Sequence, residues 1–332
     1  MLASSGTRRP QTVDELISPE LAGALDVLDV HSRRVFAGKL QGERRSKARG
    51  RSVEFEDYRQ YVPGDDLRHI DWNVFARLDK FFIKVFQEEQ DLALHVVLDA
   101  SASMDAGKPN KLLFAQKVAM ALAYLGLVNN NRVCVWVLGR AAVRRTPALR
   151  GRNSVQRVAR FLLDETFPSG GGGGGDAGAG GLSFAAAMRT LATSRTGRGV
   201  MVVLSDLLVA EGFEEGLGML AGGATGSGAP GWDVTLMQVL APGELDPMSE
   251  RDGSGGRVVI GDLRLTDAET GRIAEVTVTS DLVKKYLAKL EAYQTRLHAF
   301  ATARGMQHLV VRSDADVAGL MMDELRRRGV LR

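Results

Sequence analysis

The stretch 92-LALHVVLDASASMD-105 decides the fold, because a run of apolar residues ends in three oxygen-bearing side chains. The segment 92–98 is rich in Val and Leu with little polar alternation, as in a strand buried on both faces. Asp99, Ser101 and Ser103 follow at intervals of two residues. Ligands of open parallel sheets gather beyond the carboxyl ends of the strands, so we expect these three side chains at a binding edge.

Downstream of this stretch, short apolar strands alternate with amphipathic helical patterns. This alternation predicts an α/β fold with a doubly wound, mainly parallel sheet flanked by helices. The predicted strands cover 92–98, 132–138, 200–205, 233–239 and 308–312. The predicted helices cover 109–129, 153–166, 183–195, 210–221, 281–304 and 314–328.

The chain divides by pattern into an N-terminal section, 1–90, and an α/β domain, 91–332. The N-terminal section is expected to contain a helix at 12–38 and a strand at 80–86, and to pack on the sheet. Three segments interrupt the α/β pattern of the second domain. They are two glycine-rich loops and a small β insertion, at 169–181, 222–231 and about 241–279.

The composition is that of an ordinary globular protein, with 45% hydrophobic and 25% charged residues. We expect no membrane span, since the most apolar helical stretch, 112–128, contains Gln116 and Lys117. The N-terminus has no apolar signal core and the single cysteine excludes an internal disulfide, which favours a cytoplasmic location. The net charge is only +3, and the basic segment 33–51 is interpreted as a solvated face, so we expect no nucleic-acid partner.

The oxygen atoms at the end of the first strand favour a metal site. One carboxylate and two hydroxyls form an oxygen-only half-shell suited to Mg²⁺, with Mn²⁺ as an alternative. Asp206 supplies a second carboxylate, because it ends the strand-like 200-VMVVLSD-206 in the equivalent position. The alternative interpretation is that Asp99 and the serines cap the following helix.

The segment 99-DASAS-103 resembles the DxSxS motif of the metal-ion-dependent adhesion site in the von Willebrand factor A fold, and Asp206 resembles the later aspartate of that site. In that family a threonine from an intervening loop completes the coordination. The counterpart here is 180-GGLSFAAAM-188, in which Leu182 stands at the threonine position. Either Ser183 takes that place by a shift of one residue, or the site has only three side-chain ligands.

A second resemblance covers 55-FEDYRQYVPGDDLRHIDWNVFARLDKFFIKVFQEE-89, which is similar to the signature of the domain of unknown function 58 family. This resemblance implies two partners: an AAA+ ATPase of the MoxR type and an unidentified client protein that is assembled or activated. The charged and aromatic residues of the signature form either a buried ionic network or a docking surface. The candidates for partner binding are Arg68, Asp71, Trp72 and Arg77.

Together these observations predict a non-enzymatic, divalent-metal-dependent protein-binding adaptor. One alternative is a magnesium-dependent phosphotransferase or hydrolase that uses Asp99, but such an enzyme needs an acid at position 101, where the chain has Ser101. A serine hydrolase needs a histidine base, and none of the five histidines has an evident place at the strand edge. The remaining alternative is an adaptor whose metal site is degenerate because of Leu182.

Overall fold

The computed structural model describes residues 8–31, 53–62, 70–88, 92–139, 141–167, 182–194, 199–221, 232–248, 260–268 and 272–332. The chain forms two compact units, one of Met1–Leu40 with Leu92–Arg332 and the other of Gln41–Asp91. The first helices therefore belong to the unit that contains the sheet, which differs from the predicted division after residue 90. The predicted glycine-rich loops lie outside the described residues.

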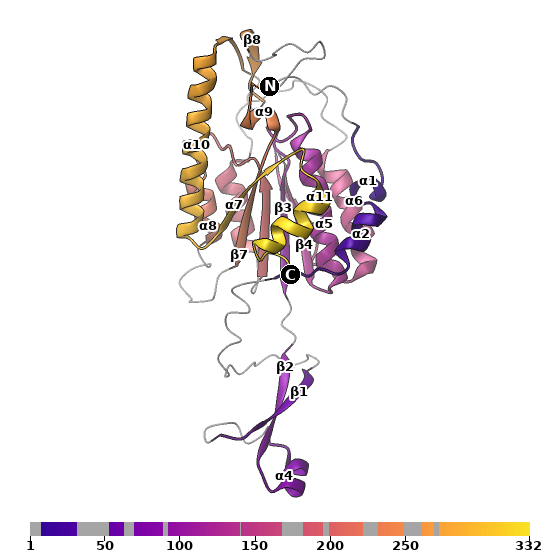
Figure 1. Ribbon diagram of the computed structural model, residues 1–332. Helices are drawn as coiled ribbons and strands as arrows, with labels where there is room; N and C mark the ends of the chain where they lie inside the picture. The colour runs from indigo at the N-terminus through magenta and orange to yellow at the C-terminus, as the bar shows by residue number, and fades with distance from the viewer. Residues whose placement is uncertain are drawn as a thin grey trace. The chain divides into compact units, whose positions relative to one another are not determined.

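The larger unit is built around a six-stranded sheet with the strand order β10-β7-β6-β3-β4-β5 (Figure 1). Its strands are β3 (Ala93–Asp99), β4 (Arg132–Leu138), β5 (Val143–Arg145), β6 (Gly199–Ser205), β7 (Asp233–Leu240) and β10 (Gln307–Arg312). Five strands are parallel and β5 pairs antiparallel with β4. The predicted mixed α/β class and its five parallel strands are confirmed. The sequence did not reveal β5, because this edge strand has three residues and no apolar run.

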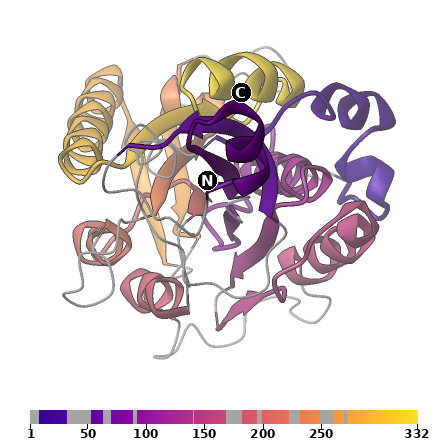
Figure 2. The same ribbon diagram turned by 90° about the horizontal axis from the view of Figure 1, so that it is seen from below.

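Helices cover both faces of this sheet (Figure 2). One face packs against α1 (Val13–Leu16), α2 (Pro19–Leu25), α5 (Lys111–Val128), α6 (Val155–Thr166) and the C-terminal turns α11 (Val317–Gly319), Leu320–Glu324 and α12 (Leu325–Arg327). The other face packs against α7 (Phe184–Ser194), α8 (Glu214–Ala221) and α10 (Ser280–Ala303). Side chains of β3 alternate between the two cores: Leu94 and Leu98 lie in the first, whereas Val97 lies in the second. Burial on both faces explains the continuous apolar sequence of the strands.

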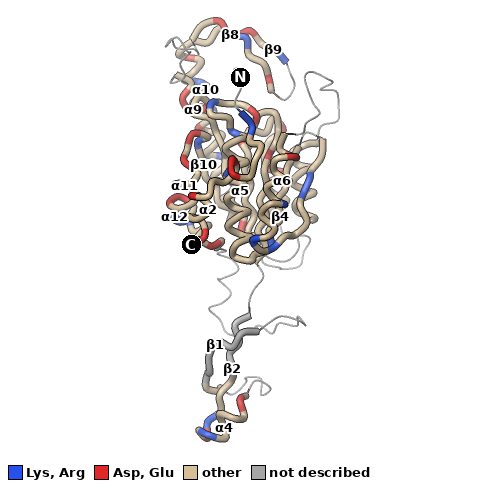
Figure 3. Tube along the Cα trace, turned by 90° about the vertical axis from the view of Figure 1, so that its right-hand side faces the viewer, with Lys and Arg blue, Asp and Glu red and all other residues tan. Residues whose placement is uncertain are grey.

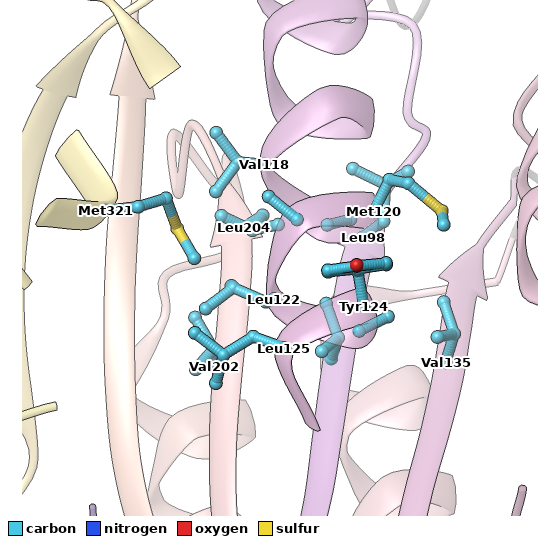
Figure 4. Close-up of a cluster of buried hydrophobic side chains, with 14 of the residues drawn as sticks. Leu98, Val118, Met120, Leu122, Tyr124, Leu125, Val135, Val202, Leu204 and Met321 are labelled. Atoms are coloured by element: carbon cyan, nitrogen blue, oxygen red, sulfur yellow. The ribbon is translucent and has the colours of Figure 1, made fainter. Parts of the chain in front are cut away.

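Helix α5 is the centre of the first core. Figure 4 shows Val118, Leu122 and Leu125 of α5 packed against Leu98 of β3 and Val202 of β6. By length and composition, α5 is the one helix within the described ranges that could cross a membrane, but 83% of that window is buried inside the protein. The burial accounts for its apolar composition, because a helix surrounded by protein has no polar face.

The predicted helix at 12–38 is wrong where the structure describes it. Residues 13–25 form two short helices, α1 and α2, and residues 32–38 lie outside the described ranges. Proline has no N–H and clashes with a preceding helical turn, so Pro19 begins a new helix instead of continuing the first. The Ser18 hydroxyl caps this second helix by accepting a hydrogen bond from the Leu21 N–H at 3.3 Å.

The β insertion and the smaller unit contain the remaining helices and strands. The predicted β insertion contains α9 (Pro242–Leu245) and an antiparallel hairpin of β8 (Gly261–Thr266) and β9 (Ile273–Val278). The smaller unit contains β1 (Val53–Gln60), antiparallel to β2 (Phe82–Glu88), and the helix α4 (Trp72–Leu78) between them. Charged residues of both signs are interspersed along the described segments of the larger unit (Figure 3), and the basic segment 33–51 lies outside the described residues.

The buried side chain of His308 on β10 makes a contribution to stability that is lost in acid. Burial, together with the nearby positive charges of His298 and Arg328, lowers the pKa of His308 from its usual 6.5 to about 4. Between pH 6.5 and 4 the unfolded chain binds a proton at this histidine and the folded chain does not, so the contribution of His308 to the free energy of unfolding falls as the pH drops. The loss from one such group is at most about 1.4 kcal/mol per pH unit.

We therefore expect the free energy of unfolding of His308→Gln to fall less, relative to the wild type, between pH 7.0 and pH 4.5. Urea unfolding of both proteins at pH 7.0, 5.5 and 4.5 measures the effect. Parallel pH profiles for the wild type and the variant would contradict the assignment.

Candidate functional site

The register of β3 and β6 brings the two predicted aspartates to one edge of the sheet. The parallel pairing places Leu98 beside Leu204, so the next residues, Asp99 and Ser205, are neighbours as well. The Ser205 hydroxyl donates a hydrogen bond of 2.5 Å to Asp99 Oδ2. Asp99 and Asp206 are 8% and 3% exposed, so both carboxylates lie largely inside the protein at the carboxyl end of the sheet.

The two predicted serines converge on the same edge. The Ser101 N–H donates a hydrogen bond of 2.9 Å to Asp99 Oδ1, which turns the chain back over the strand end. The Oγ atoms of Ser101 and Ser103 lie 3.1 Å apart. Both serines are half-buried, whereas the intervening Ala102 and the following Met104 are buried in the protein. The loop therefore turns its apolar side chains to the core and its hydroxyls to the edge.

The capping interpretation of this motif is wrong. Helix α5 begins at Lys111, and its N-cap is Asn110, whose Oδ1 accepts a hydrogen bond from the Leu113 N–H at 3.0 Å. Asp99 and the serines lie well before that cap. Their oxygens are therefore not needed to satisfy the first turn of α5.

Asp99 carries a negative charge in an unfavourable environment. Burial, followed by the charge of Asp206, raises the pKa of Asp99 from 3.8 to about 6, although hydrogen bonds from Ser205 and Ser101 act in the opposite direction. The two like charges and the low exposure explain this shift. A cation placed between the two carboxylates would relieve it.

A buried lysine that the sequence pattern did not reveal lies at the same edge. Lys111 is 0% exposed, and its Nζ lies 3.0 Å from Asp206 Oδ2 and 2.7 Å from Glu244 Oε1. Burial, the largest influence, lowers the pKa of Lys111, but the charges of Asp206 and Glu244 outweigh it, so the pKa is raised and the ammonium stays charged. The sequence offered one signal for this role. Lys111 directly precedes the most apolar helix, at the edge of the sheet where the two aspartates were predicted.

The backbone after Asp206 is strained and tightly held. Leu207 has φ +53°, a left-handed conformation that is uncommon for a residue other than glycine, and its side chain is buried. Its N–H donates to Ser205 Oγ at 3.0 Å, and the Tyr293 hydroxyl donates to its carbonyl at 2.5 Å. The Gln238 side chain also donates to the Asp206 carbonyl at 2.9 Å. Such strain is typical of functional sites.

The loop of the serines also lies close to the segment that carries Glu244. Gly107 has φ +86°, and a Cβ on this residue would lie only 2.5 Å from the Cβ of Ala241. Only glycine fits both the left-handed backbone and this close approach. The Ala241 N–H in turn donates to Glu244 Oε2 at 2.8 Å, so the loop, Ala241 and Glu244 form one packed unit.

Leu182 and Ser183 are placed at the start of α7. Leu182 is half-buried and packs against the second hydrophobic core. The Ser183 Oγ accepts a hydrogen bond of 3.2 Å from the Ala186 N–H, which caps the helix. This role explains Ser183 as a helix-start residue, and its part as a metal ligand stays a prediction.

The partner-binding candidates lie in the smaller unit. Asp71 is 5% exposed and caps α4 by accepting hydrogen bonds from the Asn73 and Val74 N–H groups. Trp72 is 61% exposed, although its ring meets those of Phe75 and Phe81 edge-on. Arg77 is exposed in the last turn of α4, and Arg68 lies outside the described residues. Asp71 thus has a structural role, whereas Trp72 and Arg77 are open to a partner.

The donors at the strand edge fit a small, hard cation. Six ligands placed about 2.1 Å from Mg²⁺ lie about 3 Å from their nearest neighbours, which matches the 3.1 Å between the two serine hydroxyls. Within the described ranges, no group of three or more His, Cys, Asp or Glu side chains could hold a metal ion. The serine hydroxyls and water would therefore have to complete the ligand set. Both Mg²⁺ and Mn²⁺ accept such neutral oxygen ligands.

The strand edge does not belong to the groove found in the larger unit. The large groove of about 940 Å³ in the described structure lies instead against α1, α2 and the start of α5. Its lining includes Asn110, Lys117 and Ser313 but neither Asp99 nor Asp206.

Comparison with known proteins identifies similar chains. A family model described as "Protein of unknown function DUF58" matches residues 57–227, more than half of the chain. This range contains Asp99, both serines, Lys111 and Asp206. The chain is also similar to two uncharacterized proteins, Rv1480 of Mycobacterium tuberculosis and Mb1516 of Mycobacterium bovis. Each is 27% identical over 323 residues, which cover 96% of this chain and 93% of the relative.

The buried ion pairs predict a large stability loss when their cation is removed. Lys111→Met leaves Asp206 and Glu244 without the ammonium, and an uncompensated buried charge costs about 3–5 kcal/mol. Lys117→Met is the matched control, because it removes an exposed lysine from the same helix. Chemical denaturation at pH 7.5 is expected to show the large loss for Lys111→Met alone, and equal losses in the two variants would contradict the importance of the pairs.

Proposed function

The chain belongs to the DUF58 family, as the resemblance of residues 55–89 predicted, and we propose that it is a non-enzymatic adaptor that binds an acidic group of a partner protein through a divalent cation. The observation that carries this proposal is the convergence of the Ser101 and Ser103 hydroxyls on the edge that holds Asp99. Magnesium is the proposed cation and manganese its substitute.

Each residue at the edge has a defined task in this proposal. Asp99, Ser101 and Ser103 hold the cation, and Asp206 contributes negative charge behind them. When bound, the cation offers an open coordination position to a carboxylate. Without it, the acidic edge would repel an acidic partner, so partner binding requires the metal. The raised pKa of Asp99 supports this view, since burial and then the charge of Asp206 disfavour its ionised form when no cation is bound.

The arrangement supports binding better than catalysis. A phosphotransferase that uses Asp99 needs an acid–base residue at position 101 and a lysine that reaches the phosphate. The chain has Ser101, and Lys111 is fully buried between two carboxylates, so its ammonium does not reach a substrate. His95 packs against Trp136 and Trp232 inside the sheet, which places it away from the serines.

The finer parts of the proposal rest on resemblance. The DxSxS motif and the later aspartate support a von Willebrand factor A-like version of the α/β fold. The signature at 55–89 supports an AAA+ ATPase of the MoxR type as partner, with an unidentified protein as client. The proposed cytoplasmic location rests on the N-terminal sequence and on the single cysteine. The exposed Trp72 and Arg77 provide a second contact surface, because tryptophan and arginine are favoured at interface hot spots.

The test is capture of partners on the tagged protein from the lysate of its host. We expect an AAA+ ATPase to be retained by the wild type in Mg²⁺ or Mn²⁺, and at least about tenfold less in EDTA, a difference of about 1.4 kcal/mol in binding. Asp99→Asn should lose the ATPase to the same extent even with the metal present. Quantitative mass spectrometry of the retained proteins measures the effect.

Asp164→Asn is the matched control, because it removes an exposed carboxylate from α6. It should retain as much ATPase as the wild type does. If the wild type and Asp99→Asn retain the ATPase equally with metal and with EDTA, the metal bridge is wrong and the surface around Trp72 becomes the binding site.

A further inference from the structure

We infer that Lys111 withholds Asp206 from the cation, so that the metal ion and the acidic group of the partner bind cooperatively, each weakly without the other. This inference rests on the proposed function and adds a control on the same site. It follows from the contacts that Lys111 makes with Asp206 and Glu244. The metal motif does not explain these contacts.

Asp206 differs from Asp99 in that an ammonium donates to one of its oxygens, whereas the donors to Asp99 are neutral. Asp206 Oδ2 accepts a hydrogen bond from Lys111 Nζ at 3.0 Å, and Asp206 Oδ1 accepts one from the Leu208 N–H at 3.2 Å. A charge-assisted hydrogen bond of this kind is about twice as strong as a neutral one. A cation that approached Asp206 Oδ2 would meet the positive ammonium at close range. Direct ligation by this oxygen therefore requires Lys111 to move.

Lys111 has little freedom to move. Its side chain is fully buried, and its second partner, Glu244, is fixed in turn. Glu244 Oε2 accepts from the Ala241 N–H at 2.8 Å, and the Glu244 carbonyl accepts from the Tyr286 hydroxyl at 2.9 Å. The close approach of Gly107 to Ala241 holds the serine loop against the same segment. The ammonium is thus locked between its two carboxylates.

Without Asp206, the ligands left for the cation carry little negative charge. Asp99 is the one carboxylate free of the lysine, and Ser101 and Ser103 add neutral hydroxyls. One formal negative charge compensates half of the charge of a divalent cation, so the ion keeps water and binds weakly. A carboxylate from a partner supplies the missing charge and displaces a water. Thermodynamic linkage then requires the cation to strengthen partner binding by the same factor.

The test compares Mn²⁺ binding by the wild type and by the double variant Lys111→Met/Glu244→Gln. The double variant removes one positive and one negative charge, so the site keeps its net charge while Asp206 Oδ2 is released. Electron paramagnetic resonance measures free Mn²⁺ in a non-coordinating buffer, with and without acetate as a simple carboxylate. Circular dichroism and thermal unfolding establish that each variant is folded.

We expect the wild type to bind Mn²⁺ weakly alone and at least about tenfold more tightly with saturating acetate. The double variant should bind Mn²⁺ alone at least about tenfold more tightly than the wild type and gain little from acetate. If the double variant binds Mn²⁺ no more tightly than the wild type, the inference is overturned.

A second comparison applies if the double variant does not fold. Asp206→Asn should weaken Mn²⁺ binding in acetate far less than Asp99→Asn does, because Asp206 is not a ligand in this scheme. Equal losses in the two variants would overturn the inference.

The outcomes also separate the inference from the proposed function. Tight Mn²⁺ binding by the wild type without acetate, abolished by Asp99→Asn, would keep the metal site and overturn the role of Lys111. Absence of Mn²⁺ binding in every variant, with or without acetate, would overturn both.

Discussion

The parallel pairing of β3 with β6 is the constraint on which the site depends. It aligns two strands that are distant in the sequence so that both end at the same level, with Ser205 hydrogen-bonded to Asp99. Hydrophobic burial on both faces of the sheet fixes this register, since a shift of one residue would exchange the side chains of the two cores. The forces that build the core therefore also place two carboxylates side by side, where electrostatics alone would separate them.

The buried Lys111 is the second element of this arrangement. Burying an ammonium is unfavourable unless carboxylates surround it, and a buried ion pair often adds little net stability compared with apolar packing. Its contacts instead fix the relative positions of three segments, because one ammonium joins the start of α5, the end of β6 and α9. The three segments that frame the edge are thereby held in one relative position. The strained Leu207 next to Asp206 fits the same view, because strain persists where the surroundings over-determine the backbone.

Most of the fold was predictable from local pattern, whereas the site was predictable only in part. Apolar runs identify β3, β4, β6 and β7 because each is buried on both faces, and β10 because its apolar run is nearly continuous although Val310 is exposed. The short edge strand β5 and the break at Pro19 depend on tertiary pairing and on a single residue, so periodicity did not reveal them. Asp99, Ser101, Ser103 and Asp206 could be assigned to one edge because parallel strands end together. Lys111 and Glu244 could not, since their meeting depends on the path of the chain between β7 and α10 and on the close approach at Gly107.

The charge at this edge is easier to explain by binding than by folding. Asp206 and Glu244 share one ammonium, whereas Asp99 does not contact it. Burial, followed by the charge of Asp206, raises the pKa of Asp99, so its ionised form is unfavourable in the folded state. An apolar or amide side chain at position 99 would remove that repulsion while leaving the β3–β6 pairing unchanged. Natural proteins accept such local conflicts mainly at functional sites. The unfavourable charge at Asp99 therefore supports the proposal that the edge binds a cation and, through it, an acidic group.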